Sequence, residues 1–177
     1  CGDVTHHPNL VNLAEMEGRY AVKHMYGFAR HSLNYDNMST VMFFRPAVAA
    51  VGLNEKGCRR RGIPYRVASY GNALVSRAIA MRATDGFSKI IVSNDDGQRL
   101  LGMRAAGPMA SNNIMTIALL MDHAPNLVDA LKTVHPHPTM SEGIQECLRV
   151  LLDKSVFKEK AFPDWIKVRT WRPEAES

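Results

Sequence analysis

Residues 87–105 read FSKIIVSNDDGQRLLGMRA, and this stretch decides the fold. Phe87–Val92 and Arg99–Ala105 are rich in β-branched and other apolar residues, as strands are. Between them, Asn94-Asp95-Asp96-Gly97 is a strong turn signal, because Asn, Asp and Gly accept the backbone angles of tight turns. The stretch is therefore predicted to be an antiparallel hairpin.

The residues upstream of this hairpin also favour strands. Three short runs with β-branched and aromatic residues are predicted strands, at Val41–Phe44, Val48–Val51 and Tyr65–Tyr70. A short helix is predicted over Asn54–Arg61. Leu74–Met81 is compatible with a helix or a strand.

Downstream of the hairpin the apolar spacing becomes helical. Asn113–His123 is apolar nearly all round and is predicted to be a largely buried helix, ended by Pro125. Asn126 can cap a second helix, whose predicted core residues are Leu127, Ala130, Leu131 and Val134. A third helix is predicted over Ser141–Asp153, with its inward residues at Ile144, Cys147, Leu148, Leu151 and Leu152. Strands followed by helices predict an α+β fold, with an antiparallel sheet and helices packed on one face.

The rest of the chain is predicted to flank this unit, which spans residues 41–155. Cys1-Gly2-Asp3-Val4 has the pattern of a strand end running into a turn, an abrupt opening that is typical of a fragment. Apolar residues at helical spacing run from Leu10 to Met25, and residues 28–40 are a polar linker. Residues 156–177 are predicted to be a basic tail that fits a regular helix poorly.

Composition narrows the class of protein. The net charge is +5, but the basic residues are scattered, which favours a solvated surface over nucleic-acid binding. Three distant cysteines, Cys1, Cys58 and Cys147, offer neither a disulfide framework nor a metal-ligand spacing, so a reducing cytoplasmic location is expected. No apolar run is long enough for a membrane span.

The most informative site candidate is His137. It lies between Pro136 and Pro138, which restrict its backbone, and the His137–Pro138 bond is a candidate for a cis peptide. Glu142 could reach the imidazole and make a general acid/base pair. The residues alone leave two alternatives open: Thr139-Met140-Ser141-Glu142 also fits a helix capping box, and His135 with His137 would make a weak metal site.

The run His137-Pro138-Thr139-Met140-Ser141-Glu142 resembles the HPT-x-S-E signature of the pyridine nucleotide-disulfide oxidoreductases, such as dihydrolipoamide dehydrogenase, glutathione reductase, mercuric reductase and the soluble transhydrogenase. Further segments resemble the dimerisation domain of that family in order and spacing: 44–53, 78–81, 86–90 and 101–110. Gly2-Asp3-Val4 and Glu17-Gly18-Arg19 resemble motifs at the end of its FAD-binding domain, so residues 1–27 would be a remnant of that domain.

This resemblance implies a function for the site residues. His137 would reach the active site of the partner subunit in a homodimer and act there as an acid/base, oriented by Glu142. Gly2 and Asp3 would lie at the FAD, with Asp3 bonded to a ribityl hydroxyl, and Leu10 and Val11 would lie beside the flavin ring. The full-length protein would be an oxidoreductase that uses FAD and NAD(P)H.

Two other motifs of the family do not occur in this sequence. The chain contains neither a G-x-G-x-x-G fingerprint nor a C-x-x-x-x-C redox pair, so it is expected to be inactive alone and to bind no cofactor firmly. A non-catalytic dimerisation or interaction module of the same fold is the alternative. The substrate, the subfamily and the choice between NAD and NADP are not encoded in these residues.

Overall fold

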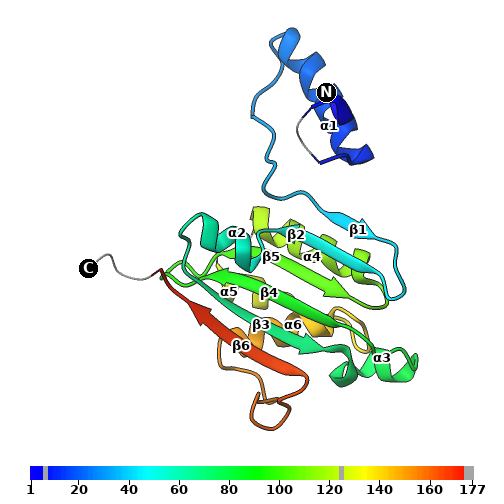
Figure 1. The fold of residues 1–177 in the computed structure, drawn as a ribbon, viewed down its shortest axis with the longest axis vertical. Helices are drawn as coiled ribbons and strands as arrows, with labels where there is room; N and C mark the ends of the chain where they lie inside the picture. The colour runs from blue at the N-terminus through cyan, green and yellow to red at the C-terminus, as the bar shows by residue number, and fades with distance from the viewer. Residues whose placement is uncertain (6–7, 124–125, 174–177) are drawn as a thin grey trace.

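A computed structural model describes residues 1–5, 8–123 and 126–173. Its centre is a six-stranded sheet in the order β1-β2-β5-β4-β3-β6, and every neighbouring pair is antiparallel (Figure 1). The strands are β1 (Thr40–Met42), β2 (Val48–Gly52), β3 (Tyr65–Gly71), β4 (Phe87–Ser93), β5 (Leu100–Ala106) and β6 (Ile166–Trp171).

The predicted hairpin is confirmed as β4 and β5. The strands pair from Phe87 with Ala106 onward, and the register shifts between Ile91 and Val92. The turn is held by Asp95, whose Oδ1 accepts hydrogen bonds from the Ser93 hydroxyl at 2.7 Å and from the amide of Gln98 at 3.0 Å. An acidic turn residue that binds nearby donors is the reason this sequence reverses direction here.

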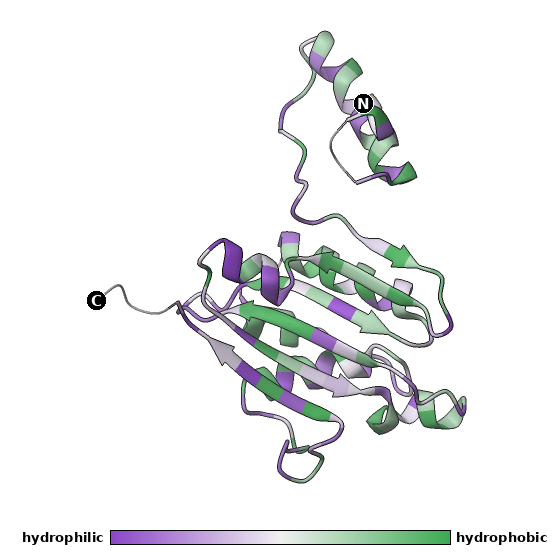
Figure 2. Cartoon of the chain, viewed as in Figure 1, coloured by the Kyte–Doolittle hydropathy of each residue, from purple (hydrophilic) through white to green (hydrophobic). Residues whose placement is uncertain are grey.

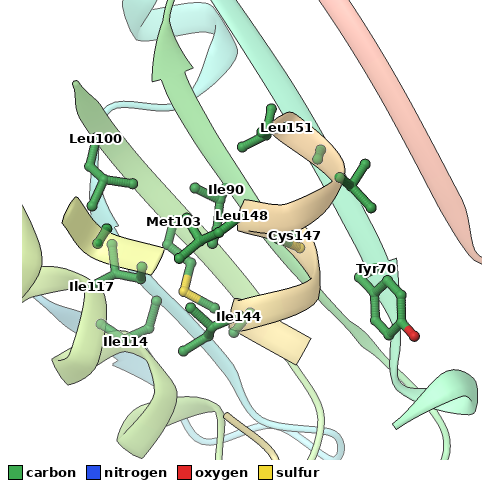
Figure 3. Close-up of a cluster of buried hydrophobic side chains, with 14 of the residues drawn as sticks. Tyr70, Ile90, Leu100, Met103, Ile114, Ile117, Ile144, Cys147, Leu148 and Leu151 are labelled. Atoms are coloured by element: carbon green, nitrogen blue, oxygen red, sulfur yellow. The ribbon is translucent and has the colours of Figure 1, made fainter. Parts of the chain in front are cut away.

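Helices cover one face of the sheet, as predicted. α4 (Ala110–His123) packs against β2 and β5, and α6 (Glu142–Leu151) packs against β3 and β4. The short α5 (Leu127–Leu131) begins at Asn126, whose side chain accepts the amide of Asp129 at 2.9 Å. Figure 3 shows the core between these layers, where side chains of α4 and α6 meet those of the strands, among them Ile90, Met103, Ile114, Ile144 and Leu148.

Two of the helix predictions need correction. α4 is not buried all round, because Met115 is 55% exposed and Leu119 is 51% exposed on its outer side. Val134 is not a core residue: it is 87% exposed, since α5 ends at Leu131 and the helical spacing does not continue to residue 134. Pro125, predicted to end the first helix, lies outside the described residues.

A smaller apolar cluster lies on the opposite face of the sheet. Cys58 comes from α2 (Glu55–Arg60), and Tyr65, Val67 and Ile91 come from the strands. Val67 is in this cluster while its neighbour Ala68 is in the main core, because successive side chains of a strand point to opposite faces. The ambiguous segment Leu74–Met81 is helical, with a 3-10 turn at Asn72–Leu74 and α3 at Ser76–Ala80.

The prediction of a C-terminal tail over residues 156–177 needs correction, because part of this segment belongs to the sheet. β6 pairs with β3, with Trp171 opposite Tyr65 at one end and Ile166 opposite Tyr70 at the other. The domain therefore extends beyond the boundary expected at residue 155. Its side chains alternate, with Ile166 fully buried and Lys167 exposed, and Figure 2 shows hydrophilic and hydrophobic residues alternating along it. This period of two is typical of a strand with one face on a core.

The N-terminal residues lie apart from the sheet. Gly2–Val4 form a 3-10 turn rather than the expected end of a strand, and α1 spans Val11–Met25. Residues 26–39 contain no helix or strand and connect α1 to β1. In Figure 1, α1 stands above the sheet at the end of this connection.

Candidate functional site

The loop between α5 and α6 carries His137. The His137–Pro138 peptide bond is cis, as the sequence predicted. The Thr139 hydroxyl donates to the carbonyl of Pro136 at 2.8 Å and lies 2.8 Å from the hydroxyl of Ser141. Because these bonds cross the loop, they restrict the backbone on both sides of the histidine.

Glu142, the first residue of α6, contacts both ends of this loop. Its Oε1 lies 2.7 Å from Nδ1 of His137, and its Oε2 accepts the amide of Thr139 at 2.9 Å. The second bond is half of the predicted capping box. The reciprocal half would be a bond from the amide of Glu142 to the Thr139 hydroxyl; that hydroxyl instead bonds to Pro136 and Ser141, and Ser141, the N-cap of α6, makes no side-chain cap bond. This one carboxylate therefore orients the histidine and also holds the amide of Thr139.

The two side chains of the pair differ in exposure. The His137 side chain is 68% exposed, and that of Glu142 is 23% exposed. Burial acts to raise the pKa of Glu142, but the hydrogen bonds from His137 and Thr139 outweigh it, and the pKa is lowered from its ordinary value. Glu142 is thus held as a carboxylate, which is the form that accepts a hydrogen bond from an imidazole.

This geometry sets the tautomer of the neutral imidazole. With Nδ1–H donating to Glu142, Nε2 becomes the atom that takes up or releases a proton. Within the described part of the chain, Nε2 forms no hydrogen bond, and the ring is largely open to solvent. Such a pair can act as a general acid or base toward a group outside this chain.

His135, the other histidine of the segment, is in a different environment. Burial and the nearby charge of Arg149 lower its pKa, so it is held neutral, and its Nε2 is buried without a hydrogen-bond partner among the described residues. Across residues 1–5, 8–123 and 126–173, no three His, Cys, Asp or Glu side chains gather as metal ligands.

The residues predicted to contact FAD lie at the start of the chain. Gly2 has a positive φ of 74°. Its amide donates to Oε2 of Glu17 at 2.6 Å, so this amide is already bonded to a residue of α1. Asp3 is exposed. Leu10 is the N-cap residue of α1 and makes no side-chain cap bond, and Val11 is 85% exposed. An uncapped, exposed helix N-terminus fits an electron-rich group such as the pyrimidine edge of a flavin.

Glu17 is a residue whose role the sequence did not reveal. It is 5% exposed, and besides the amide of Gly2 it accepts the hydroxyl of Tyr35 at 3.2 Å. The sequence holds two signals: the run Glu17-Gly18-Arg19, which resembles a family motif, and the spacing of four from the buried Leu13, which places both residues on the same side of α1. Glu17 thereby fixes the turn that carries Asp3.

The chain does not bring these two groups of residues together. The turn with Asp3 and the N-terminus of α1 lie above the sheet, whereas α6 lies behind it (Figure 1). Leu10 and Val11 instead line a hollow of about 520 Å³ together with Met115 and Leu119 of α4. Cys58 and Cys147 do not contribute, since both are buried and burial raises the pKa of both thiols.

The fold and the site define an α+β domain that exposes a carboxylate-oriented imidazole just before its last core helix. Residues 38–148 match the family model described as the pyridine nucleotide-disulphide oxidoreductase dimerisation domain. The chain therefore belongs to the pyridine nucleotide-disulphide oxidoreductase family, as its motifs indicated.

Individual relatives agree with this assignment. The chain is 35% identical over 147 residues to mitochondrial dihydrolipoyl dehydrogenase of Schizosaccharomyces pombe, covering 83% of this chain and 28% of that protein. It is 32% identical over 152 residues to dihydrolipoyl dehydrogenase of Chlamydia muridarum, covering 86% of this chain and 32% of that protein. The chain thus spans about a third or less of the curated relatives it matches.

Solved structures confirm the fold. LpdA from Mycobacterium tuberculosis superposes with a TM-score of 0.78 at 27% identity, over 85% of this chain and 32% of that one. The HOCl-induced flavoprotein disulfide reductase RclA from Escherichia coli gives 0.74 at 25% identity, over 85% of this chain and 34% of that one. Among the described residues, no helix has the length and apolarity needed to cross a bilayer.

Proposed function

We propose that this chain is the dimerisation domain of an FAD-dependent, NAD(P)H-linked disulfide oxidoreductase, and that His137 with Glu142 supplies the acid/base pair of the partner subunit's active site. One observation carries the proposal: the imidazole is 68% exposed while its Nδ1 is held 2.7 Å from a carboxylate. A ring oriented by its own chain and open on its other side is suited to a substrate or a partner.

The chemistry of disulfide exchange needs such a group. A thiol must lose its proton before it attacks a disulfide, and the thiolate that leaves must gain one. Nε2 of His137 would accept the first proton and return it to the leaving sulfur, while Glu142 stabilises the imidazolium in between. Bound FAD would pass electrons between the nicotinamide nucleotide and the disulfide.

The arrangement of the cofactor end of the chain supports a site shared between subunits. Leu10 and Val11, proposed to lie beside the flavin, face the same hollow as the exposed Met115 and Leu119 of α4. A second subunit seated on α4 would therefore lie next to the cofactor. In Figure 1, α1 stands above the sheet and α6, the helix that carries Glu142, lies behind it, which also favours a site completed by a second subunit.

The test uses the full-length protein that contains this chain, with the two half reactions measured separately by stopped flow. His137→Gln should slow the thiol–disulfide half reaction by about a hundredfold or more, the usual contribution of general acid/base catalysis. Reduction of the flavin by the nucleotide should be unchanged. His31→Gln, at an exposed position in the connection between α1 and β1, is the matched control and should leave both rates unchanged.

Equal losses in both half reactions, or no loss in either, would contradict the assigned role. A full-length protein that purifies colourless and binds no FAD would instead support the alternative, a non-catalytic dimerisation module.

Subunit mixing tests whether the histidine acts across the dimer. Subunits with His137→Gln are mixed with subunits that cannot hold FAD, for example Asp3→Leu. If the histidine serves the partner, the mixed dimer has one complete site and recovers activity that neither parent has. Mixed dimers that remain inactive would show that each chain uses its own histidine.

A further inference from the structure

α4 and the His137 loop meet at a buried hydrogen bond. Nδ2 of Asn113 donates to the carbonyl of Met140 at 3.4 Å, and the two residues are 27 positions apart in the sequence. The same carbonyl accepts the amide of Gly143 at 3.2 Å, in the first turn of α6. Met140 is 2% exposed and packs in the main core, so this bond lies at the base of the loop.

Asn113 is an unusual residue at its position in the helix. It is 6% exposed, and the neighbouring buried residues of α4 are apolar: Ala110, Ile114, Ile117 and Ala118. A buried amide is costly unless its hydrogen bonds are made, so its presence on a core-facing side points to a specific partner. That partner is the main chain between Thr139 and Ser141.

The contact leads directly to the acid/base pair. Thr139 precedes Met140 and donates its amide to Oε2 of Glu142, whose Oε1 lies 2.7 Å from His137. Ser141 follows Met140 and is the N-cap of α6. A shift of the Met140 carbonyl would therefore move both the amide that holds Glu142 and the start of the helix that carries it.

We propose that Asn113 is a positioning residue for the His137–Glu142 pair, acting through the main chain of Met140. This inference rests on the proposed function of the pair. Asn113 touches neither the imidazole nor the carboxylate, and its effect is to hold the carboxylate where it orients Nδ1 of His137.

The experiment compares half reactions in the full-length protein with Asn113→Leu, which removes the amide with little change in volume. The thiol–disulfide half reaction should slow roughly three- to tenfold, the range expected for the loss of one buried hydrogen bond. Flavin reduction by the nucleotide should be unaffected. Lys167→Leu, at an exposed position of β6 outside both α4 and the His137 loop, is the control and should retain the wild-type rate.

A double variant separates positioning from general loosening. In a Glu142→Gln background, Asn113→Leu should cause little further loss, because the group that Asn113 positions is already gone. If the two changes slow the thiol–disulfide half reaction by independent factors that multiply in the double variant, the proposal is overturned. Asn113→Asp keeps the size of the side chain and lacks the donor, so a protein with this change and the full wild-type rate would also overturn it.

Failure of this inference can be told apart from failure of the proposed function. If His137→Gln leaves the thiol half reaction unchanged, the pair has no acid/base role and the function itself is wrong. If His137→Gln slows that step while Asn113→Leu does not, only the role of Asn113 is wrong.

Discussion

The carbonyl of Trp165 accepts a hydrogen bond from the amide of Gly71 at 2.7 Å, and the indole of Trp165 lies where a side chain on residue 71 would begin. This contact joins the end of β3 to the residue just before β6. Further along the same pair of strands, the rings of Tyr65 and Trp171 stack with centroids 5.7 Å apart. The C-terminal segment is therefore attached to the edge of the sheet at both ends of β6.

Gly71→Ala tests the close approach of Trp165. A Cβ on residue 71 would lie 2.8 Å from Cε3 and 3.2 Å from Cβ of Trp165, so the indole must move. We expect a loss of about 1–3 kcal/mol in the free energy of unfolding, as for other overpacked sites, measured by urea denaturation. Gly97→Ala is the control, because its new Cβ would meet only ordinary contacts at 3.4 Å and beyond. Equal stability of both variants would show that the indole does not pack this closely on Gly71.

Ile166→Ala tests whether β6 contributes to the core. Ile166 is fully buried, and removing most of its side chain should cost about 2–5 kcal/mol of unfolding free energy. The adjacent Lys167 points away from the core and is exposed, so Lys167→Ala should change stability by less than about 0.5 kcal/mol. A small effect at residue 166 would mean that the segment is a loosely attached tail, as the sequence suggested.

Local patterns were sufficient to predict the hairpin and the existence of most of the helices. The turn residues around Asp95 and the cap at Asn126 act on neighbours within a few positions, so both can be found in the sequence. A poor fit to a helix does not exclude β6, because the alternation of Ile166 and Val168 against Lys167 and Arg169 is a strand pattern. A strand also depends on a distant partner, here β3, which no local pattern identifies.

The candidate site likewise contains one contact that the sequence predicts and others that it does not. His137 and Glu142 are five residues apart on either side of a helix start, so their contact could be predicted from the sequence. The bonds of Glu17 to Gly2 and of Asn113 to Met140 could not, because each joins a side chain to a backbone group 15 or 27 residues away. A backbone partner can be any residue type, and it leaves no motif.

The ion pair between Glu55 and Lys89 should make stability depend on pH. Their charged atoms lie 2.8 Å apart, and both side chains are partly buried. Burial acts to raise the pKa of Glu55, but hydrogen bonds, including that from Lys89, outweigh it and the pKa is lowered. A carboxyl group with a lowered folded-state pKa stabilises the fold above its unfolded-state pKa, and this contribution is lost as the pH falls through the folded-state value.

Glu55→Gln should therefore be less stable than the wild type at neutral pH, by up to about 1 kcal/mol for such a solvent-screened pair. The difference should shrink as the pH is lowered below the ordinary range of a carboxyl group, because the wild type then loses the same charge. Urea denaturation at a series of pH values measures both curves. A difference that stays constant down to about pH 3, below the ordinary carboxyl pKa, would mean that the ion pair is not its cause.

Met115 and Leu119 on the exposed side of α4 should carry part of the proposed homodimer contact. Both are about half exposed, and both line the hollow that also contains Leu10 and Val11. Burying a lysine in an apolar interface is unfavourable, so the double variant Met115→Lys, Leu119→Lys of the full-length protein should dissociate. We expect the dimer dissociation constant to rise at least about a hundredfold, as when a central contact of an interface is lost.

Sedimentation velocity over a range of concentrations measures this shift. Because both residues face outward in the single chain, the variant should fold normally, and its circular dichroism should match that of the wild type. Val156→Lys adds a charge at another exposed apolar residue, 84% exposed, and is the matched control that should remain dimeric. If the α4 variant sediments as a dimer at the same concentrations as the wild type, the two-fold contact does not include this side of α4. The histidine would then have to reach its partner across a different surface.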